Sequence, residues 1–469
     1  MIFSSSIFLY IFLPLFALAY AAFPRKNIVL LVASLLFYAW GEHIFVLLMV
    51  AVAAVNYLFG ILVNGESPYR FRYLVIAVML NVATLIGFKY LGFLVENLNY
   101  LLQSFAFPEF KTLPVPHPSL PLGISFFIFQ SITYVVDVYR RHAMPAQKFT
   151  DVLLYISLFP QLVAGPIVRY EEIAERIQSR RSDWNRIISG VELFAVGLAK
   201  KVLIADSLSV PVDQIFSMPA DELGMGLAWF GIVCFALQIF FDFSGYSDMA
   251  IGIGRVLGFN FPENFNQPYR SRTIQEFWRR WHMTLSRWFR DYVYIPLGGN
   301  RLGVARTYIN LLGVFILTGF WHGASWNFLI WGLIHGLFLI IERLGLANWL
   351  QRVWAPIGHL YVIGVVLLGW VFFRTDNITS ALEYLGAMVA MNPISIMSGL
   401  GDIASLYMLS IAILGSILAT LPERDSWESK DTKNLWKSIL LYSFLSITTL
   451  LSLALISSYS HKAFIYFRF

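Results

Sequence analysis

The sequence predicts an all-α, polytopic membrane protein, and three observations support that fold class. Hydrophobic residues occupy 58% of the 469 positions and charged residues only 13%, whereas soluble domains carry roughly a quarter charged residues. Aromatic residues reach 17%, which suits lipid-facing helices and interfacial belts. Apolar segments long enough to cross about 30 Å of hydrocarbon recur along the chain, and helices satisfy their own backbone groups in lipid. We expect a single integral-membrane domain over residues 1–469.

The predicted spans fall into two groups, divided by a long polar and aromatic interruption. Those before it are Ile2–Ala22, Ile28–Trp40, Phe45–Val63, Tyr73–Leu91, Leu122–Val138, Val152–Val168, Ile187–Ile204 and Leu227–Phe243. Those after it are Tyr308–Phe320, Trp326–Ile341, Leu360–Phe373, Ser405–Leu421 and Leu435–Ile456. Because a straight span needs roughly 17 to 25 residues, we expect the shorter segments to tilt or to enter without crossing.

The charge pattern predicts topology and excludes a nucleic-acid-binding protein. The first apolar segment has no Lys or Arg before it, and the first cations, Arg25 and Lys26, follow it. This order predicts an uncleaved first span with its N-terminus outside and the 25–26 turn in the cytoplasm. The net charge of +6 lies mainly in short loops and one arginine-rich stretch, so the expected partner is the lipid bilayer and no nucleic acid.

Prolines interrupt two regions. Pro160 and Pro166 lie inside Val152–Val168, which we expect to be re-entrant or tilted beside a cavity, since irregular backbone at membrane depth needs protein or water around it. The segment Phe107–Gly123 is proline-rich and is predicted to form an ordered external or interfacial loop. The charged segment Leu421–Trp436 is predicted to be a solvated loop.

The stretch Phe261–Arg306 carries eight arginines and no lysine, so it is too cationic to span the bilayer. Its aromatic and apolar residues recur at three- and four-residue spacing, whereas polar residues fall on another face. The first set is Phe277, Trp281, Leu285, Trp288, Phe289 and Tyr292, and the second is Arg279, His282, Ser286 and Arg290. This pattern predicts one amphipathic helix, anchored by aromatic side chains at the membrane surface or within the protein.

The helix would present guanidinium groups, among them those of Arg279, Arg280 and Arg287, that suit bidentate binding of phosphate, as on a coenzyme or a lipid headgroup. The alternative is that these arginines extend to lipid phosphates and set topology, which explains most of them equally well. His282 differs, because a titratable imidazole adds a group that anchoring does not require. A structural hydrogen-bonding role for His282 stays open.

The segment Thr318–Arg343 is an apolar helix interrupted by polar groups. Trp331 lies four positions before His335 and Asn327 eight, so the three side chains share a helical face. Gly332 and Gly336 flank His335, and Gly319 and Gly323 flank His322, which predicts close approach of neighbouring helices. We therefore expect His335 to be buried in protein. An ionisable residue at this depth is a functional hypothesis, because an unpartnered polar group there is costly.

A neutral imidazole in an apolar tunnel is a suitable general base, and His335 would deprotonate a hydroxyl that attacks a thioester. The alternative is a core histidine that hydrogen-bonds a neighbouring helix. His322, within Trp321-His322-Gly323, is predicted to be a supporting structural group.

Two carboxylates, Asp242 and Asp248, follow the predicted span Leu227–Phe243. At membrane depth each needs a partner, so we expect pairing with arginines of the next segment or coordination of a cation. A structural salt bridge is at least as good an explanation as a catalytic role. No metal site and no bound cofactor are predicted.

Beyond these arguments, the chain resembles the membrane-bound O-acyltransferases, in particular the branch of alginate O-acetyltransferase and related bacterial polysaccharide O-acetylating proteins. The resemblance runs nearly end to end. It rests on FSSSIFLYIFLPLF, PLGISFFIFQSITYVVDVYR, FPQLVAGPIVRY, SGYSDMAIGIGRVLGF, FNQPYRSRTIQEFWRRWHMTLSRWFRDYVYIPLGGNR, WHGASWNFLIWGLIHG and the closing FIYFRF. The closing motif and Gly298-Gly299-Asn300 favour this branch over the D-alanylating branch that acts on teichoic acid.

The resemblance implies about a dozen helices around a central funnel or tunnel, with the family's invariant histidine at His335 and a second conserved histidine at His282. It implies a cytoplasmic acyl donor, acetyl-CoA, although relatives accept acyl groups from a carrier protein. It also implies a polysaccharide acceptor outside the cytoplasmic (inner) membrane of a bacterium. A separate periplasmic or extracellular SGNH-type transferase is the expected partner, because this chain has no Gly-Asp-Ser nucleophile motif.

Three functions therefore compete. The first is an O-acetyltransferase that uses His335 and His282. The second is a transporter or polysaccharide exporter whose polar residues line a permeation path. The third is a non-catalytic scaffold of an acetylation complex. The residues alone leave the first two close, and the resemblance places the enzyme first.

Overall fold

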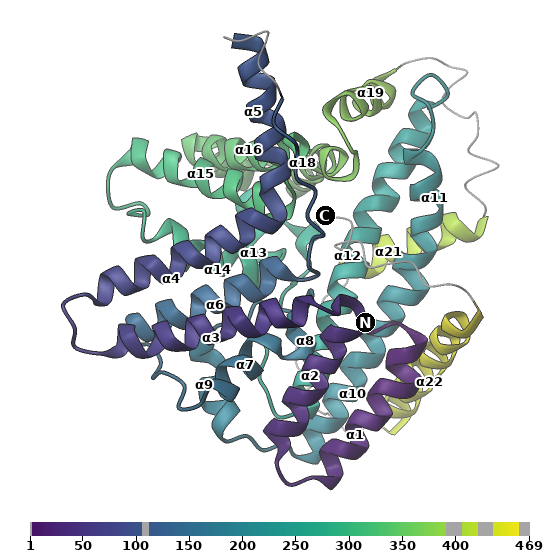
Figure 1. The fold of residues 1–469 in the computed structure, drawn as a ribbon. Helices are drawn as coiled ribbons and strands as arrows, with labels where there is room; N and C mark the ends of the chain where they lie inside the picture. Colours follow the sequence, from purple (N-terminus) through teal and green to yellow (C-terminus); the bar gives the residue numbers. More distant parts are fainter. Residues whose placement is uncertain (1, 106–111, 391–405, 421–434, 459–469) are drawn as a thin grey trace. The chain divides into compact units, whose positions relative to one another are not determined.

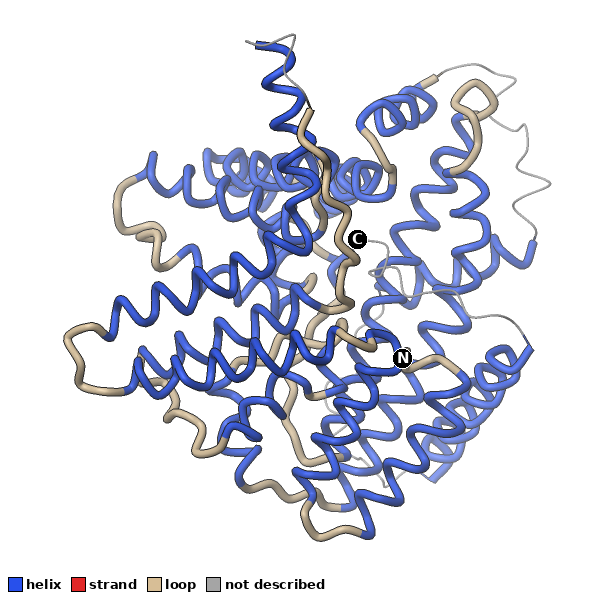
Figure 2. The backbone as a smooth tube through the Cα atoms, viewed as in Figure 1, coloured by secondary structure: helices blue, strands red, loops and turns tan. Residues whose placement is uncertain are grey.

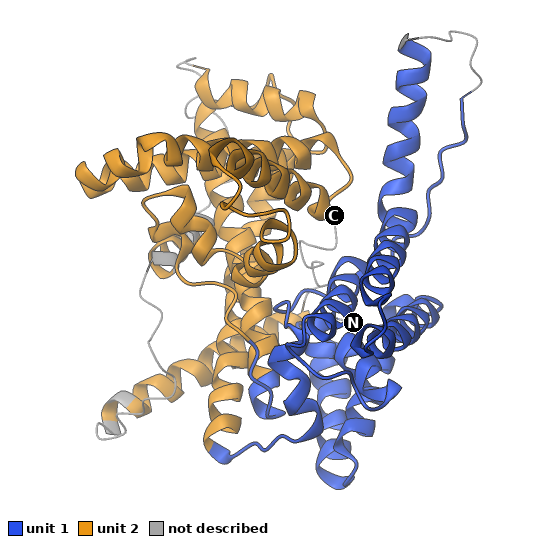
Figure 3. Cartoon of the chain, turned by 90° about the vertical axis from the view of Figure 1, so that its left-hand side faces the viewer, with its two compact units in different colours: residues 1–184, 254–261 blue, residues 185–253, 262–469 orange. Residues whose placement is uncertain are grey.

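The computed structural model describes residues 2–105, 112–390, 406–420 and 435–458. Within these ranges helices are joined by turns and loops and no strand occurs (Figure 2). The chain divides into two compact units, residues 1–184 with 254–261 and residues 185–253 with 262–469 (Figure 3). The loop predicted at Leu421–Trp436 and the closing FIYFRF lie almost wholly outside the described residues.

The first unit is a bundle of helices around a buried one. Its elements are η1 (Phe8–Phe12), α1 (Leu13–Ala22), α2 (Lys26–Glu42), α3 (Phe45–Asn64), α4 (Arg70–Leu85), η2 (Ile86–Tyr90), α5 (Leu91–Phe105), α6 (Ile124–Tyr139), α7 (Phe149–Ser157), α8 (Phe159–Leu162) and α9 (Tyr170–Gln178). Helix α6 is buried along nearly its whole length and packs against α3, α4, α7 and α9 (Figure 1). The proline-interrupted segment Val152–Val168 breaks into α7, α8 and a loop, as its prolines predict.

The second unit contains the arginine-rich stretch and the histidine-bearing helices. It runs from α10 (Trp184–Ala199) through η3 (Lys200–Ala205), α11 (Asp206–Phe216), α12 (Met225–Val256), η4 (Pro268–Arg270), α13 (Ile274–Arg280), α14 (Met283–Phe289), η5 (Arg290–Tyr294), α15 (Val304–His322), α16 (Trp326–Ile341), η6 (Glu342–Leu346), α17 (Ala347–Arg352), α18 (Ala355–Arg374), α19 (Ile378–Val389), α21 (Leu406–Thr420) and α22 (Leu435–Ser458). The unit boundary cuts α10 at its first residue and α12 in its last turn.

Among the described residues, seven helices are long and apolar enough to cross a membrane. They are Phe45–Asn64, Arg70–Ser104, Met225–Val256, Val304–His322, Trp326–Arg352, Ala355–Arg374 and Ser438–Ser458. The predicted all-α polytopic membrane fold is confirmed. The central funnel stays a prediction.

Two predicted boundaries were wrong because polar residues do not end their helices. The span predicted at Tyr73–Leu91 belongs to a continuous 35-residue helical segment, Arg70–Ser104. The span predicted to end at Phe243 continues to Val256, because lysines of η3 pair with its two carboxylates and glycines let α10 approach it closely. A backbone that is closely packed and electrostatically compensated stays helical through residues that otherwise favour a turn.

Candidate functional site

The helix that carries His335, α16, packs against α15 through two glycines that face each other. A methyl group added at Gly319 would overlap the carbonyl oxygen of Phe328, and one added at Gly332 would overlap that of Phe315. The two helices lie side by side in the second unit (Figure 1). The close approach predicted from the glycine spacing is confirmed, and it fixes the rotation of α16 about its own axis.

The buried face of α16 presents the three predicted side chains. Asn327, Trp331 and His335 are each no more than 2% exposed. The Asn327 amide donates hydrogen bonds to Thr375, at 2.7 Å to its carbonyl oxygen and 3.1 Å to its Oγ1, and thereby joins the start of α16 to the end of α18. The Trp331 and His335 rings lie 5.1 Å apart, so the one-turn spacing in the sequence becomes a direct contact.

A glycine of α18 faces the imidazole of His335. A methyl group added at Gly369 would lie 2.9 Å from His335 Nε2 and 3.3 Å from Cδ1 of Trp331, closer than ordinary van der Waals contact. On the other side of the ring, Nδ1 is buried and forms no hydrogen bond within the described residues. His335 is therefore packed by rings and a bare backbone, which keeps its imidazole free of a carboxylate or cation.

Trp278 of α13 packs edge-on against His335, with ring centroids 5.1 Å apart. The carboxylate of Glu342, which follows α16 directly, holds α13 in place by accepting the backbone N–H groups of Ile274 and Gln275. The same carboxylate accepts a hydrogen bond from the Tyr361 hydroxyl at 3.2 Å. The residue that directly follows the His335 helix thus positions the tryptophan that packs against His335.

The predicted single amphipathic helix over residues 277–292 was wrong. It breaks after Arg280 into α13 and α14, because His282 adopts a left-handed backbone conformation with φ 43° and ψ 53°. That conformation is uncommon for a residue with a Cβ and cannot continue a helix. As a result His282 leaves the face of Arg279 and Arg290, which are exposed, and becomes fully buried.

The side-chain amide of Asn264 hydrogen-bonds His282, and this contact determines which ring nitrogen of His282 carries the proton. Asn264 Oδ1 lies 3.0 Å from His282 Nδ1 and accepts hydrogen bonds from the backbone N–H and the hydroxyl of Thr284. Because a backbone N–H only donates, this atom is the amide oxygen, and His282 Nδ1 must carry the proton. The lone pair then lies on Nε2, which is buried and has no hydrogen-bond partner in the described residues.

Burial without a charged partner lowers the pKa of His282 to about 3. The ring is therefore neutral near pH 7, with Nε2 as a proton acceptor. This arrangement suits a group that receives a proton transiently rather than one that carries a charge at rest.

A chain of aromatic rings joins the two predicted catalytic histidines within the second unit. His282 lies 6.2 Å from Trp321, Trp321 lies 4.9 Å from His322, and His322 lies 5.1 Å from Trp331, which contacts His335. His322 is 5% exposed. The structure thus brings all three imidazoles into one network, with His322 between the other two.

The three candidate donor-binding arginines differ in their surroundings. Arg279 is exposed, and Arg280 forms a salt bridge to Glu276 at 2.9 Å. Arg287 is half-buried on α14, beyond the break. A guanidinium already paired with a carboxylate is a weaker phosphate ligand, so this geometry favours Arg279 over Arg280.

The carboxylates of α12 pair with lysines rather than with arginines of the next segment, which corrects that expectation. Lys201 lies 2.9 Å from Asp242, and Lys200 lies 2.7 Å from Asp248. The first pair is almost fully buried and the second is about a fifth exposed. These contacts fasten η3 to α12 and give Asp248 a structural partner.

Four residues of this site were not singled out from the sequence. Trp278 and Gly369 pack against His335, Glu342 caps α13, and Asn264 holds His282. Only Glu342 left a local signal, as a carboxylate at the end of an apolar helix. The other three act through contacts between segments that are distant in the chain.

Comparison with known proteins identifies the family. The model of the membrane-bound O-acyltransferase family matches residues 127–373. A probable alginate O-acetylase, AlgI, of Pseudomonas putida is 38% identical over 100% of both chains. The peptidoglycan O-acetyltransferase of Helicobacter pylori is 37% identical over 84% of this chain and 81% of its own.

The D-alanylating branch is more distant. The teichoic acid D-alanyltransferase of Bacillus subtilis is 30% identical over 54% of this chain and 67% of its own. The family and these relatives confirm an acyltransferase, whereas the catalytic roles of His335 and His282 stay predictions. The chain belongs to the membrane-bound O-acyltransferase family, in its alginate O-acetyltransferase-like branch, and is a multi-pass membrane acyltransferase.

Proposed function

We propose that this enzyme passes an acetyl group from cytoplasmic acetyl-CoA toward hydroxyl groups of a polysaccharide outside the bacterial inner membrane. A separate SGNH-type transferase receives the acyl group and completes the transfer. The names of the relatives, which act on alginate and peptidoglycan, support acetyl as the group and a glycan as the acceptor. The observation that carries the proposal is the network in which buried aromatic rings connect the imidazoles of His282, His322 and His335.

In the proposed reaction His335 is the general base. Its imidazole takes the proton of the attacking hydroxyl while the hydroxyl oxygen bonds to the thioester carbon. The carbon–sulfur bond then breaks, and the proton passes to the departing thiolate, which regenerates the neutral ring. If the ring itself accepts the acyl group, a ring nitrogen bonds to the thioester carbon and the thiolate leaves with the proton of the acylated ring. The attacking hydroxyl then displaces the imidazole, which takes up the hydroxyl proton.

His282 is proposed as the helper of His335. With its proton fixed on Nδ1 by Asn264, its Nε2 accepts a proton from an approaching hydroxyl or water. Complete burial against Phe243 and Trp321 excludes bulk water, which keeps the ring uncharged between turnovers.

Asn264→Ala is expected to lower acyl transfer about tenfold, the order of magnitude of one lost hydrogen bond that orients a reacting group. Asn264→Asp keeps the acceptor oxygen and should retain more activity. Transfer of labelled acetyl from acetyl-CoA by the purified variants measures both. If His282→Gln and Asn264→Ala act through the same ring, their effects will not add, whereas additive losses would show that Asn264 has a separate role.

The proposed function is tested by the acetyl content of the cell-surface glycans. Deleting this chain should leave the polysaccharide at the surface but without its O-acetyl groups, as mass spectrometry would show. Deleting the SGNH-type partner should have the same effect. An exporter would instead lose the polysaccharide from the surface, and an unchanged acetyl content would reject the proposal.

A further inference from the structure

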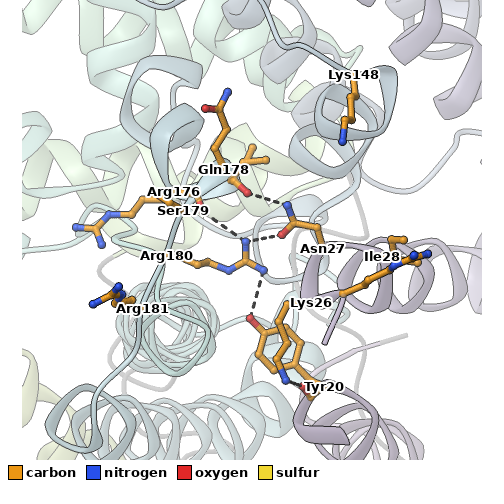
Figure 4. A pocket seen from close by; sticks show the side chains of 12 residues that line it. Tyr20, Lys26, Asn27, Ile28, Lys148, Arg176, Gln178, Ser179, Arg180 and Arg181 are labelled. Carbon is orange, nitrogen blue, oxygen red and sulfur yellow. Dashed lines mark hydrogen bonds between the residues drawn. The ribbon is translucent and has the colours of Figure 1, made fainter. Parts of the chain in front are cut away.

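An open cavity of about 970 Å³ lies within the first unit, and none of its lining residues has been considered so far as catalytic. It is lined by the end of α1, the start of α2, the residue before α7, and the end of α9 with the turn that follows (Figure 4). Half of its lining residues are cations and none is acidic. The cations are Arg25, Lys26, Lys148, Arg176, Arg180 and Arg181.

Arg180 is held rigidly at the centre of this cavity by neutral groups. Its guanidinium donates to Asn27 Oδ1 at 2.5 Å and to the Tyr20 hydroxyl at 3.2 Å (Figure 4). It also donates to the Leu257 carbonyl at 3.2 Å. The same group lies 4.6 Å from the ring centroid of Phe259. Because every one of these partners is uncharged, the positive charge of Arg180 is oriented but not neutralised.

Two further residues at the start of α2 join the walls of the cavity. The Lys26 ammonium donates to the carbonyls of Tyr20 and Ala21 at the end of α1. The Asn27 amide donates to the Ile177 carbonyl at 2.7 Å, near the end of α9. Each helix end contributes roughly half a negative charge, so two ends offset about one of the six cations. The cavity stays strongly positive.

Setting the orientation of the chain in the membrane does not require cations that are bonded into one shared cavity. Cations that only set orientation extend separately to the interface and need no shared cavity. Here segments 150 residues apart are bonded to each other around Arg180, and Lys148 directs its ammonium group toward the same space (Figure 4). A rigid, positive and open cavity without carboxylates is suited to a ligand with more than one negative charge.

We propose that this cavity binds a phosphate-bearing ligand, independently of the acyl-transfer chemistry proposed above. The exposed side chains of Arg25, Lys148 and Arg181 contact the phosphates. Arg180 and Lys26 hold the walls of the cavity together through their hydrogen bonds to Asn27 and to the end of α1. The 25–26 turn is predicted to be cytoplasmic, where two sources of this chemistry exist. One is the headgroup of an anionic phospholipid, and the other is a soluble nucleotide with phosphomonoester groups.

The test uses the purified full-length chain in nanodiscs and three proteins: the wild type, a cavity variant and a matched control. The cavity variant is Arg25→Gln, Lys148→Gln and Arg181→Gln. The control, Arg301→Gln, Arg306→Gln and Arg352→Gln, removes the same charge from exposed positions outside the cavity. Calorimetry in phosphatidylcholine discs measures binding of adenosine 3′,5′-bisphosphate, and native mass spectrometry of mixed discs measures retention of phosphatidylglycerol.

We expect the cavity variant to lose about tenfold or more in affinity for one probe, since each charge-assisted bond to phosphate is worth at least that factor. The control should change less than about twofold. Loss of bisphosphate binding identifies a soluble nucleotide as the source, and loss of phosphatidylglycerol identifies a lipid headgroup. The proposal is overturned if the wild type binds neither probe, or if the cavity variant and the control weaken binding equally. Neither result depends on acyl transfer.

Discussion

Replacing His335 by Ala is expected to reduce acyl transfer by about two to four orders of magnitude, the usual contribution of a general base, while the chain stays folded. The imidazole packs against Trp278, Trp331 and the bare backbone of Gly369, so its loss removes ring contacts but leaves no unpaired charge. Transfer of labelled acetyl from acetyl-CoA by the purified variant measures the activity, and thermal unfolding in detergent measures the fold.

His322→Gln is the control, because His322 lies in the same network of rings and is also buried. We expect it to lose stability more than activity. If His322→Gln abolishes transfer and His335→Ala does not, the catalytic role belongs to His322. If both variants keep full activity, the imidazole network is structural.

Gly319→Ala is expected to destabilise the protein by about 3 kcal/mol or more, the upper range for forcing atoms into a packed interior. The added methyl group would overlap the Phe328 carbonyl oxygen, so α15 and α16 must separate or bend. That movement would also displace the buried face that carries His335. The unfolding temperature and the rate of acyl transfer should therefore both fall, whereas His335→Ala should lower only the rate of transfer.

Gly313→Ala on the same helix provides the control. A methyl group there meets nothing within 4 Å. Because Ala favours the helix over Gly by about 1 kcal/mol, this variant should be unchanged or slightly more stable. Equal losses at both positions would mean that the contact between α15 and α16 at Gly319 does not set the effect, because helix propensity alone predicts a gain at both positions.

Helix α16 shows how much the sequence determines. Its bounds, Trp326–Ile341, coincide with the predicted span, because a mainly apolar segment of this length satisfies its backbone groups in lipid only as a helix. The shared face of Asn327, Trp331 and His335 follows directly from helical geometry. Where one helix contains the whole pattern, spacing alone places the side chains.

The surroundings of His282 show what the sequence does not reveal. Periodicity continued through residues 277–292 and predicted one helix, yet a single left-handed residue broke it. The cause is a hydrogen-bonded amide 18 positions earlier, which holds both His282 and Thr284. No local pattern distinguishes Asn264 from other loop asparagines, so its role depends on the tertiary fold.

The cationic cavity was missed for the same reason. Arg25 and Lys26 carried a topological signal by themselves, and Lys148 and Arg180 carried none. The lysine partners of Asp242 and Asp248 likewise come from an element about 40 to 50 residues away. Charge clusters assembled from several segments need a structure before they can be recognised.

The most direct test of the proposed function is acyl transfer across a sealed membrane. The purified chain is reconstituted in vesicles with its SGNH-type partner and a polysaccharide acceptor inside, and labelled acetyl-CoA is added on the cytoplasmic face. We predict that the enclosed polysaccharide becomes labelled with the wild type and not with His335→Ala. An acceptor that stays unlabelled inside while acetyl-CoA outside is consumed, or labelling that is equal for both proteins, would contradict a His335-dependent transfer through the membrane.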